Sequence, residues 1–210
     1  MKKSIVCILV LCLMFLTACS SSAMRSSSNN TAKKSDTIKI GALLPSSGVY
    51  ASLGENNLNG MKLYFEERNW EIAGKKVEII HEDSESDPQV SLRKLRKLTD
   101  QDQIDFLTGP ISTAVAYAIR DEVVNKNLPF LVSHAGGNDL TREKRSDYIW
   151  RASFSSWQIG HSMGAWAYEN IGKKIYLTAA DYAFGHEVAT AFKEAYTAAG
   201  GVIVDEVYPP

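Results

Sequence analysis

Residues 105–113, Asp-Phe-Leu-Thr-Gly-Pro-Ile-Ser-Thr, decide the fold and contain the most informative candidate site of the chain. The apolar run at 104–107 predicts a short buried strand, which the Gly-Pro pair ends. Ser112 and Thr113 then open a segment with apolar residues at every fourth position, which predicts a helix. A strand, a glycine turn and a helix start bring free backbone N–H groups and two hydroxyls to the positive end of the helix dipole. This arrangement is typical of a binding site for a carboxylate or a phosphate. The alternative interpretation is that Ser112 and Thr113 form an ordinary N-cap.

The same alternation of strand and helix continues on both sides of this stretch. Strands joined to helices by short turns predict parallel sheets with helices on both faces. A second series of alternating strands and helices begins after residue 153. It contains only two strands, which cannot bury both faces of a sheet. We therefore expect a second lobe that is incomplete, with the sequence ending inside it. The predicted strands are 38–44, 76–81, 104–107, 128–132, 148–152, 174–180 and 202–207, and the predicted helices are about 54–70, around 92–98, from 112, 156–171 and 184–199.

Three loops are expected to form one ligand site. Ligands of parallel α/β sheets bind at the carboxyl ends of the strands, where loops lead into helices. The loops at 45–54, 109–113 and 133–138 all follow predicted strands. The topology therefore predicts that they converge.

The N-terminal segment does not belong to the predicted fold. Two lysines at positions 2 and 3 precede an apolar run at 5–15, which has the length of a secretory signal rather than of a membrane span. The tetrapeptide at 16–19, Leu-Thr-Ala-Cys, resembles the bacterial lipobox, in which the cysteine becomes the lipidated first residue of the mature protein. We therefore predict a signal peptide at 1–18 and a lipid anchor on Cys19, the alternative being a plain signal peptide.

A tether is predicted between the lipidated cysteine and the folded part. Residues 20–35 are rich in Ser, Asn and Lys, so 19–36 is interpreted as the anchor and a flexible linker. Cys7 and Cys12 lie in the segment to be removed, which leaves Cys19 alone and excludes an intramolecular disulfide.

Composition and motifs argue against several functional classes. A net charge of −1 gives no support for nucleic acid as a partner. His134, His161, His186 and Asp181 are candidates for a hydrolase, but the sequence contains no Gly-x-Ser-x-Gly, P-loop or His-Glu-x-x-His motif, so no catalytic residue is expected. The acidic run at 82–87 lacks the glycine and the spacing of a calcium loop, so neither a metal nor a cofactor is expected.

Five motifs after the lipobox, in this order and spacing, point to a family. They are Leu-Pro-Ser-Ser-Gly at 44–48, Gly-Pro-Ile-Ser-Thr at 109–113, Ser-His-Ala-Gly-Gly at 133–137, Trp-Arg-Ala-Ser at 150–153 and Asp-Tyr-Ala-Phe-Gly at 181–185. From about residue 37 onward the chain resembles the solute-binding lipoproteins of ABC importers of the leucine/isoleucine/valine-binding type. The resemblance implies a type I periplasmic-binding-protein fold of two lobes, about twice the present length, with residues 37–154 forming the first lobe and 155–210 the start of the second.

The same resemblance assigns the site residue by residue. The carboxylate position falls on Ser112 and Thr113, which is the anion site derived above. The contacts to a ligand amine fall on Ala135 and Gly137. Amino-acid binders usually carry Thr or Ser at the position of Gly137, so this chain lacks the hydroxyl that would contact the amine. The ligand-contacting set expected in this way is Tyr50, Leu53, Ile111, Ser112, Thr113, Ala135, Gly137, Tyr182 and Phe184.

Ligand and partners are expectations of the same resemblance. The ligand is either a branched-chain or other hydrophobic amino acid or an aromatic carboxylate, and the two stay equally open. The implied partners are an ABC permease and ATPase, with contact to the membrane through the lipid anchor alone, for an extracytoplasmic monomer. A sensory ectodomain of the same fold is the alternative, and a secreted hydrolase is a remote one.

Overall fold

The computed structural model describes residues 36–210. The predicted signal peptide, Cys19 and residues 20–35 of the tether lie outside the described residues. In the part that is described, no helix is both long enough and apolar enough to cross a membrane.

Six strands form one sheet in the order β2-β3-β1-β4-β5-β6. All neighbours are parallel except β2 and β3, which form an antiparallel pair. Parallel strands separated by helices confirm the predicted α/β class. The strands are β1 (Thr37–Leu44), β2 (Glu71–Ile72), β3 (Lys75–Asp83), β4 (Phe106–Gly109), β5 (Phe130–Val132) and β6 (Ile149–Arg151).

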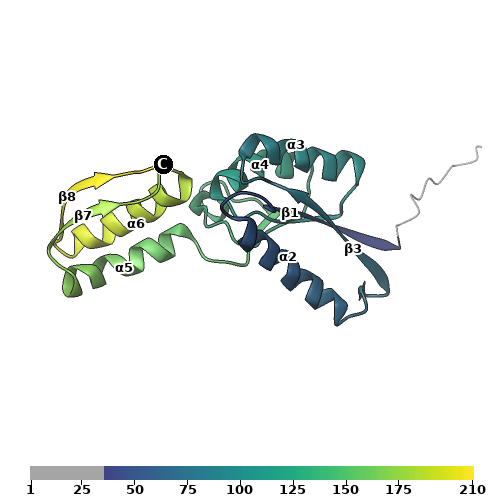
Figure 1. Ribbon diagram of the computed structural model, residues 1–210, viewed down its shortest axis with the longest axis horizontal. Helices are drawn as coiled ribbons and strands as arrows, with labels where there is room; N and C mark the ends of the chain where they lie inside the picture. Colours follow the sequence, from purple (N-terminus) through teal and green to yellow (C-terminus); the bar gives the residue numbers. More distant parts are fainter. Residues whose placement is uncertain (1–35) are drawn as a thin grey trace, which may run out of the picture. The chain divides into compact units, whose positions relative to one another are not determined.

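Helices cover both faces of this sheet (Figure 1). Helix α2 lies on one face, and α3 and α4 lie on the other. The short helices η1 and η2 follow α3 and β5 in the chain. The bounds are α2 (Ala51–Glu66), α3 (Pro88–Arg96), the π-helix η1 (Lys97–Gln101), α4 (Thr113–Asn125) and the 3-10 helix η2 (Asn138–Thr141).

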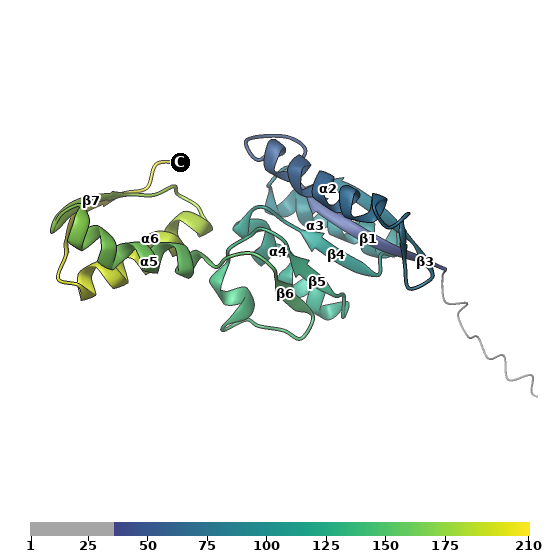
Figure 2. The ribbon, with the colours of Figure 1, turned by 90° about the horizontal axis from the view of Figure 1, so that it is seen from below.

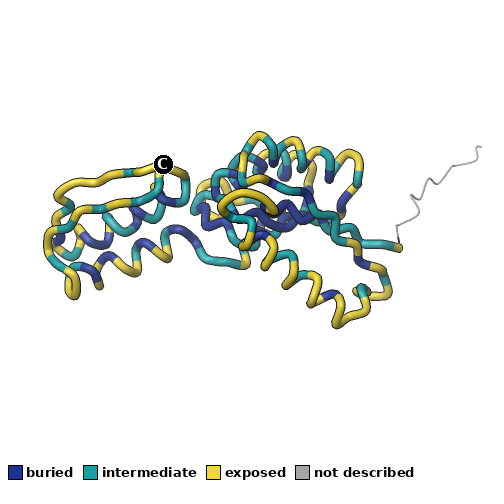
Figure 3. Tube along the Cα trace, in the orientation of Figure 1, coloured by how far each residue is buried: buried dark blue, intermediate teal, exposed yellow. Residues whose placement is uncertain are grey.

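The buried core consists of two clusters of side chains, and Figure 3 shows that buried residues gather in the interior of the first series of elements. On the α3 and α4 face, Leu43, Leu107 and Phe130 pack with the apolar stripes of the helices, including Ile119. On the α2 face a smaller cluster of Ala42, Leu44 and Ile111 packs against partly buried side chains of the loop before α2 and of α2 itself. The central strands β1 and β4 are therefore covered on both sides, as expected for parallel strands.

The second series of elements forms a separate two-stranded parallel sheet (Figure 2). Helices α5 and α6 pack closely because glycines of α5 face the α6 backbone: a Cβ added at Gly160 would lie 2.2 Å from the Val188 carbonyl oxygen. Strands β7 and β8 are largely exposed. The elements are α5 (Ser156–Asn170), β7 (Lys174–Thr178), α6 (Ala183–Ala198) and β8 (Val202–Val207).

Besides shifts of one or two residues at other strand ends, the structure differs from the predicted elements in three ways. Helix α2 starts and ends earlier than 54–70, because Asn69 and Trp70 adopt positive φ angles that no helix continues through. Strand β3 runs on to Asp83, beyond the predicted end of the strand at residue 81. The short elements β2, η1 and η2 were not predicted at all.

Candidate ligand-binding site

The turn between β4 and α4 has the geometry expected of an anion site. Gly109 has a φ of +113°, and a Cβ there would lie 2.3 Å from the Leu43 carbonyl oxygen, so only glycine fits. Ser112 is the N-cap of α4, and its hydroxyl accepts a hydrogen bond of 3.4 Å from the Val115 N–H. Ser112 and Thr113 also line a cavity. Ser112 is therefore an N-cap, as the alternative interpretation predicts. The same residue also lines the cavity.

This cavity has a volume of about 220 Å³ and collects most of the predicted ligand contacts. Seven of the nine predicted residues line it, and whether they bind a ligand stays a prediction. No Asp, Glu, Lys or Arg is among the lining residues. The lining consists of Tyr50, Leu53, Ile111, Ser112, Thr113, His134, Gly136, Phe154, Tyr182 and Phe184.

Rings from both series of elements form one wall of the cavity. Phe154 lies edge-on to Phe184, with 6.0 Å between ring centroids, and Tyr182 stacks on Phe184 at 6.3 Å. The Tyr50 hydroxyl donates a hydrogen bond of 3.0 Å to the Tyr182 hydroxyl. That hydrogen bond, together with burial, raises the pKa of Tyr182 to about 12. The Tyr182 phenol is therefore neutral near pH 7.

His134 and Phe154 were not in the predicted ligand set. The His134 ring lies edge-on to Phe154, with 5.6 Å between centroids. Burial lowers the pKa of His134, which keeps its imidazole neutral at pH 7. The signal that could have found His134 is its place in the loop after β5, at a carboxyl end of the sheet.

Ala135 and Gly137 do not line the cavity, although the family resemblance placed the amine contacts there. Ala135 is 1% exposed and belongs to the core on the α4 face. Gly137 faces the ring of Tyr117, which a Cβ at this position would approach to 2.8 Å. Gly136, which lies between them, lines the cavity instead.

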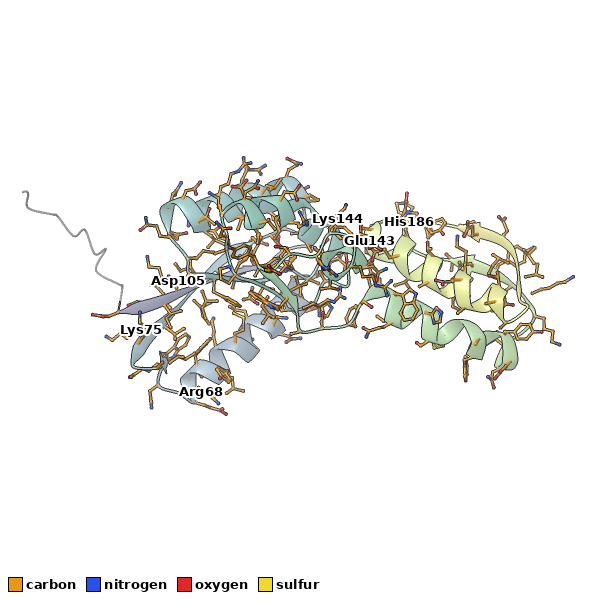
Figure 4. All side chains as sticks on the ribbon, turned by 180° about the vertical axis from the view of Figure 1, so that it is seen from behind. Arg68, Lys75, Asp105, Glu143, Lys144 and His186 are labelled. Atoms are coloured by element: carbon orange, nitrogen blue, oxygen red, sulfur yellow. The ribbon has the colours of Figure 1, made fainter. Side chains whose placement is uncertain are left out.

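Three of the candidate hydrolase residues, His161, His186 and Asp181, have partners of other kinds. His186 pairs with Asp181 at 2.7 Å, and both side chains are about half exposed. His186 also lines a second cavity of about 450 Å³ with Glu143 (Figure 4), and the lining of that cavity contains neither Ser nor Cys. His161 stacks on Trp157. None of these arrangements forms a nucleophile–base pair.

The acidic run at 82–87, which begins inside β3, is used within the fold. Glu82 pairs with Lys94 at 2.8 Å and with Lys97 at 2.7 Å. Asp83 accepts backbone hydrogen bonds from Ser46 at 2.9 Å and from Glu85 at 2.8 Å. No group of three or more potential metal ligands occurs among residues 36–210. These carboxylates therefore join β3 to α3 and to the loop before α2.

Comparison with known proteins places the whole described fold in one family. A family model described as "Periplasmic binding protein" matches residues 37–210. The Leu/Ile/Val-binding protein homolog 6 of Brucella abortus is 29% identical over 181 residues, which cover 86% of this chain and 46% of that protein. The chain thus spans about half the length of the curated relatives it matches.

Solved structures agree in fold. A solute-binding protein of an ABC transporter from Rhodopseudomonas palustris BisB5, in complex with 3,4-dihydroxybenzoic acid, is 35% identical with a TM-score of 0.77, over 82% of this chain and 47% of that one. Another from R. palustris, in complex with benzoate, is 31% identical with a TM-score of 0.79, over 82% and 48%. The sheet order, the glycine turn before α4 and these matches lead to one conclusion: the chain belongs to the periplasmic binding protein family.

Proposed function

We propose that this chain is part of the extracytoplasmic solute-binding component of an ABC importer, and that it captures a small carboxylate in the cavity at the start of α4. One observation carries the proposal: the cavity joins a helix N-terminus, with the Ser112 and Thr113 hydroxyls, to an apolar wall of rings. Free N–H groups and the helix dipole stabilise an anion, and the rings accommodate its apolar part. The relatives named above, which bind benzoate and 3,4-dihydroxybenzoic acid, support this choice.

The proposed mechanism is capture followed by closure. The carboxylate docks at Ser112 and Thr113, and Tyr182 and Phe184 then cover the apolar end from the second series of elements. Closure is favoured because a ligand that touches both sides stabilises only the closed arrangement. The solved relatives named above are solute-binding proteins, which supports binding without chemical turnover.

Location and partners complete the proposal. A signal peptide at 1–18 and a lipid on Cys19 would hold the protein at the outer side of the cell membrane, because acyl chains contribute about 0.8 kcal/mol per buried methylene. The monomer would deliver its ligand to a permease driven by an ATPase. Residues 37–154 and 155–210 are assigned to the first lobe and to the start of the second.

Substitution of Ser112 tests the carboxylate site. We expect Ser112→Ala to weaken benzoate binding about tenfold, since one hydrogen bond to a charged group is lost. Isothermal titration calorimetry with benzoate measures the effect. The matched control is Ser155→Ala, because Ser155 is also an N-cap serine, accepting 3.2 Å from the Gln158 N–H, and does not line the cavity.

The two variants separate binding from helix capping. Both should lose stability, by about 0.5–2 kcal/mol for a serine N-cap. Only Ser112→Ala should lose affinity. Unchanged benzoate affinity in Ser112→Ala would refute the carboxylate role of Ser112, and no benzoate binding by the unaltered chain would refute the proposed function.

A further inference from the structure

We infer that Glu187 of α6 acts as a latch, a contact that holds the second series of elements against the first without touching the ligand. Such a contact raises the affinity for every ligand by one common factor. The inference rests on the proposed function where it concerns affinity, because it assigns a residue to the closure step. The contact itself lies between protein groups, so it can be tested without a ligand.

The Glu187 carboxylate connects α6 to two segments of the first series. One of its oxygens accepts a hydrogen bond from the Tyr117 hydroxyl on α4. The other accepts 3.0 Å from the Asn138 N–H at the start of η2. The Tyr117 hydroxyl in turn accepts 3.2 Å from the Asp139 N–H. Both carboxylate oxygens and the phenol are thus engaged in one hydrogen-bonded group that spans the two series.

The protonation of Tyr117 fits this arrangement. Burial and the hydrogen bond to Glu187 raise the pKa of Tyr117, so the phenol keeps its proton and donates it. Hydrogen bonds to a carboxylate are stronger than those between neutral groups. Glu187 and Tyr117 are both partly shielded from solvent, and salt screens such a pair less than an exposed one.

The Tyr117 ring reaches Glu187 because position 137 has no side chain. A Cβ built at Gly137 would lie 2.8–3.0 Å from atoms of the Tyr117 ring, closer than a Cβ normally approaches. A larger residue at this position would therefore displace the ring from its place beside Glu187. Gly137 thus has a role in the contact between the two series.

The latch lies apart from the proposed ligand cavity. Neither Glu187 nor Tyr117 lines that cavity, and Glu187 lines the second cavity of about 450 Å³ instead. At the ligand cavity the two series meet through the Tyr50–Tyr182 hydrogen bond and the rings of the wall, which are themselves lining groups. Glu187 is therefore placed to favour closure before any ligand is bound.

A contact of this kind acts on affinity through the population of the closed arrangement. A ligand that binds only this arrangement has an apparent Kd equal to its intrinsic Kd divided by the closed fraction of the ligand-free protein. Loss of Glu187 lowers that fraction by the same amount whichever ligand is added. A residue that touches the ligand would instead change the affinities of different ligands by different factors.

Amide hydrogen exchange of the ligand-free chain tests the contact itself. In Glu187→Ala the Asn138 amide loses its acceptor, so its exchange should be about tenfold faster. The Leu107 amide of β4, which donates 2.8 Å to the Pro129 carbonyl oxygen, should exchange as before and reports on global stability. Glu194→Ala is the matched control, because it removes an exposed carboxylate from the same helix.

Small-angle X-ray scattering of the same ligand-free samples tests whether the contact keeps the two series together. The radius of gyration should be larger in Glu187→Ala than in the unaltered chain, and Glu194→Ala should not change it. This readout separates a latch from a hydrogen bond that affects the Asn138 amide alone.

Calorimetry with benzoate and with 3,4-dihydroxybenzoate tests the effect on capture. Glu187→Ala should weaken both acids by the same factor, about tenfold, since hydrogen bonds to a charged group are lost from the closed arrangement alone. Tyr117→Phe removes one of these bonds and should weaken both acids less. In the Tyr117→Phe background, Glu187→Ala should have a smaller effect than in the unaltered chain, because the two side chains share a hydrogen bond.

The outcomes separate the latch from the proposed function. Faster Asn138 exchange, a larger radius of gyration and an equal loss of affinity for both acids support the latch. An unchanged radius, unchanged affinities, or losses that differ between the two acids overturn it and leave the proposed function standing. If the unaltered chain binds neither acid, the proposed function and the effect on affinity both fail, while exchange and scattering still decide whether Glu187 holds the two series together.

Discussion

At the scale of single residues, Asp83 links the sheet to the loop that reaches the cavity. Its carboxylate accepts hydrogen bonds from the N–H groups of Ser46 and Glu85. Burial alone would raise the pKa of Asp83, but these bonds and those from the Ser46 and Ser47 hydroxyls outweigh it and lower the pKa to about 2. The ionised carboxylate thus holds the loop that leads to two lining residues, Tyr50 at the end of the loop and Leu53 in the first turn of α2.

Asp83→Asn should therefore destabilise the protein near neutral pH by up to about 2 kcal/mol, since each pKa unit corresponds to about 1.4 kcal/mol. The folded-state pKa is below the ordinary value of 3.8, so this stability is present above pH 4 and is lost as the pH falls from about 4 to 2. Urea unfolding at several pH values measures it, with the exposed Asp147→Asn as the control. A deficit that does not shrink below pH 3 would contradict the assignment.

At the scale of elements, the close contact between α5 and α6 depends on two glycines of α5, which have no side chain. Gly160 meets the Val188 carbonyl, and a Cβ at Gly164 would lie 2.5 Å from the Cβ of Ala195 and 2.6 Å from the Tyr196 nitrogen. Backbone cannot move aside as a flexible side chain can. Because α6 begins at Ala183 and carries Phe184, the spacing of the two helices also helps to place the aromatic wall.

Gly160→Ala should cost about 1–3 kcal/mol of stability, the range for overpacking a close contact. Gly60→Ala in α2 is the matched control, because a Cβ there meets nothing within 4 Å. Alanine is the better helix former, so the control should gain about 0.5–1 kcal/mol. Chemical unfolding of both variants gives the comparison. Equal effects of the two substitutions would mean that α5 and α6 are not in close contact.

Sequence reasoning predicted elements well where local pattern decides them. The apolar run of β1 and the stripe of α4 are set by their own residues, and both were found. Strand β2 has two residues and exists through its pairing with β3, so its own sequence gave no signal. The candidate site shows the same difference between what local sequence determines and what distant residues determine. The turn and helix start at 109–113 follow from local sequence, whereas the position of Gly137 depends on contacts with Tyr117 and Arg151, which are distant in sequence.

At the scale of the whole molecule, buried apolar residues are distributed unevenly. The main core cluster draws its members from Leu43 to Ile149, all within the first series of elements. In β7 and β8 most residues are exposed, among them Tyr176 at 76% (Figure 3). Six strands with helices on both faces satisfy the requirements of an independent fold, and two strands do not.

A chain of residues 36–154 should therefore fold alone, with a cooperative thermal transition and far-UV circular dichroism typical of an α/β protein. Residues 155–210 alone should show no such transition, because one two-stranded sheet leaves its faces uncovered. Circular dichroism of the two separate chains tests the proposed lobe boundary at 154/155. A non-cooperative 36–154 chain would place that boundary elsewhere.

The left-handed glycine at position 109 has a consequence for how such a binder could be given a new specificity. With no room for any side chain beside Leu43, position 109 at the proposed carboxylate site is closed to substitution. Adaptation to other acids must then proceed through replaceable rings such as Phe154 and Phe184. A library randomised at those two positions should exchange one organic acid for another while the requirement for a negative charge persists.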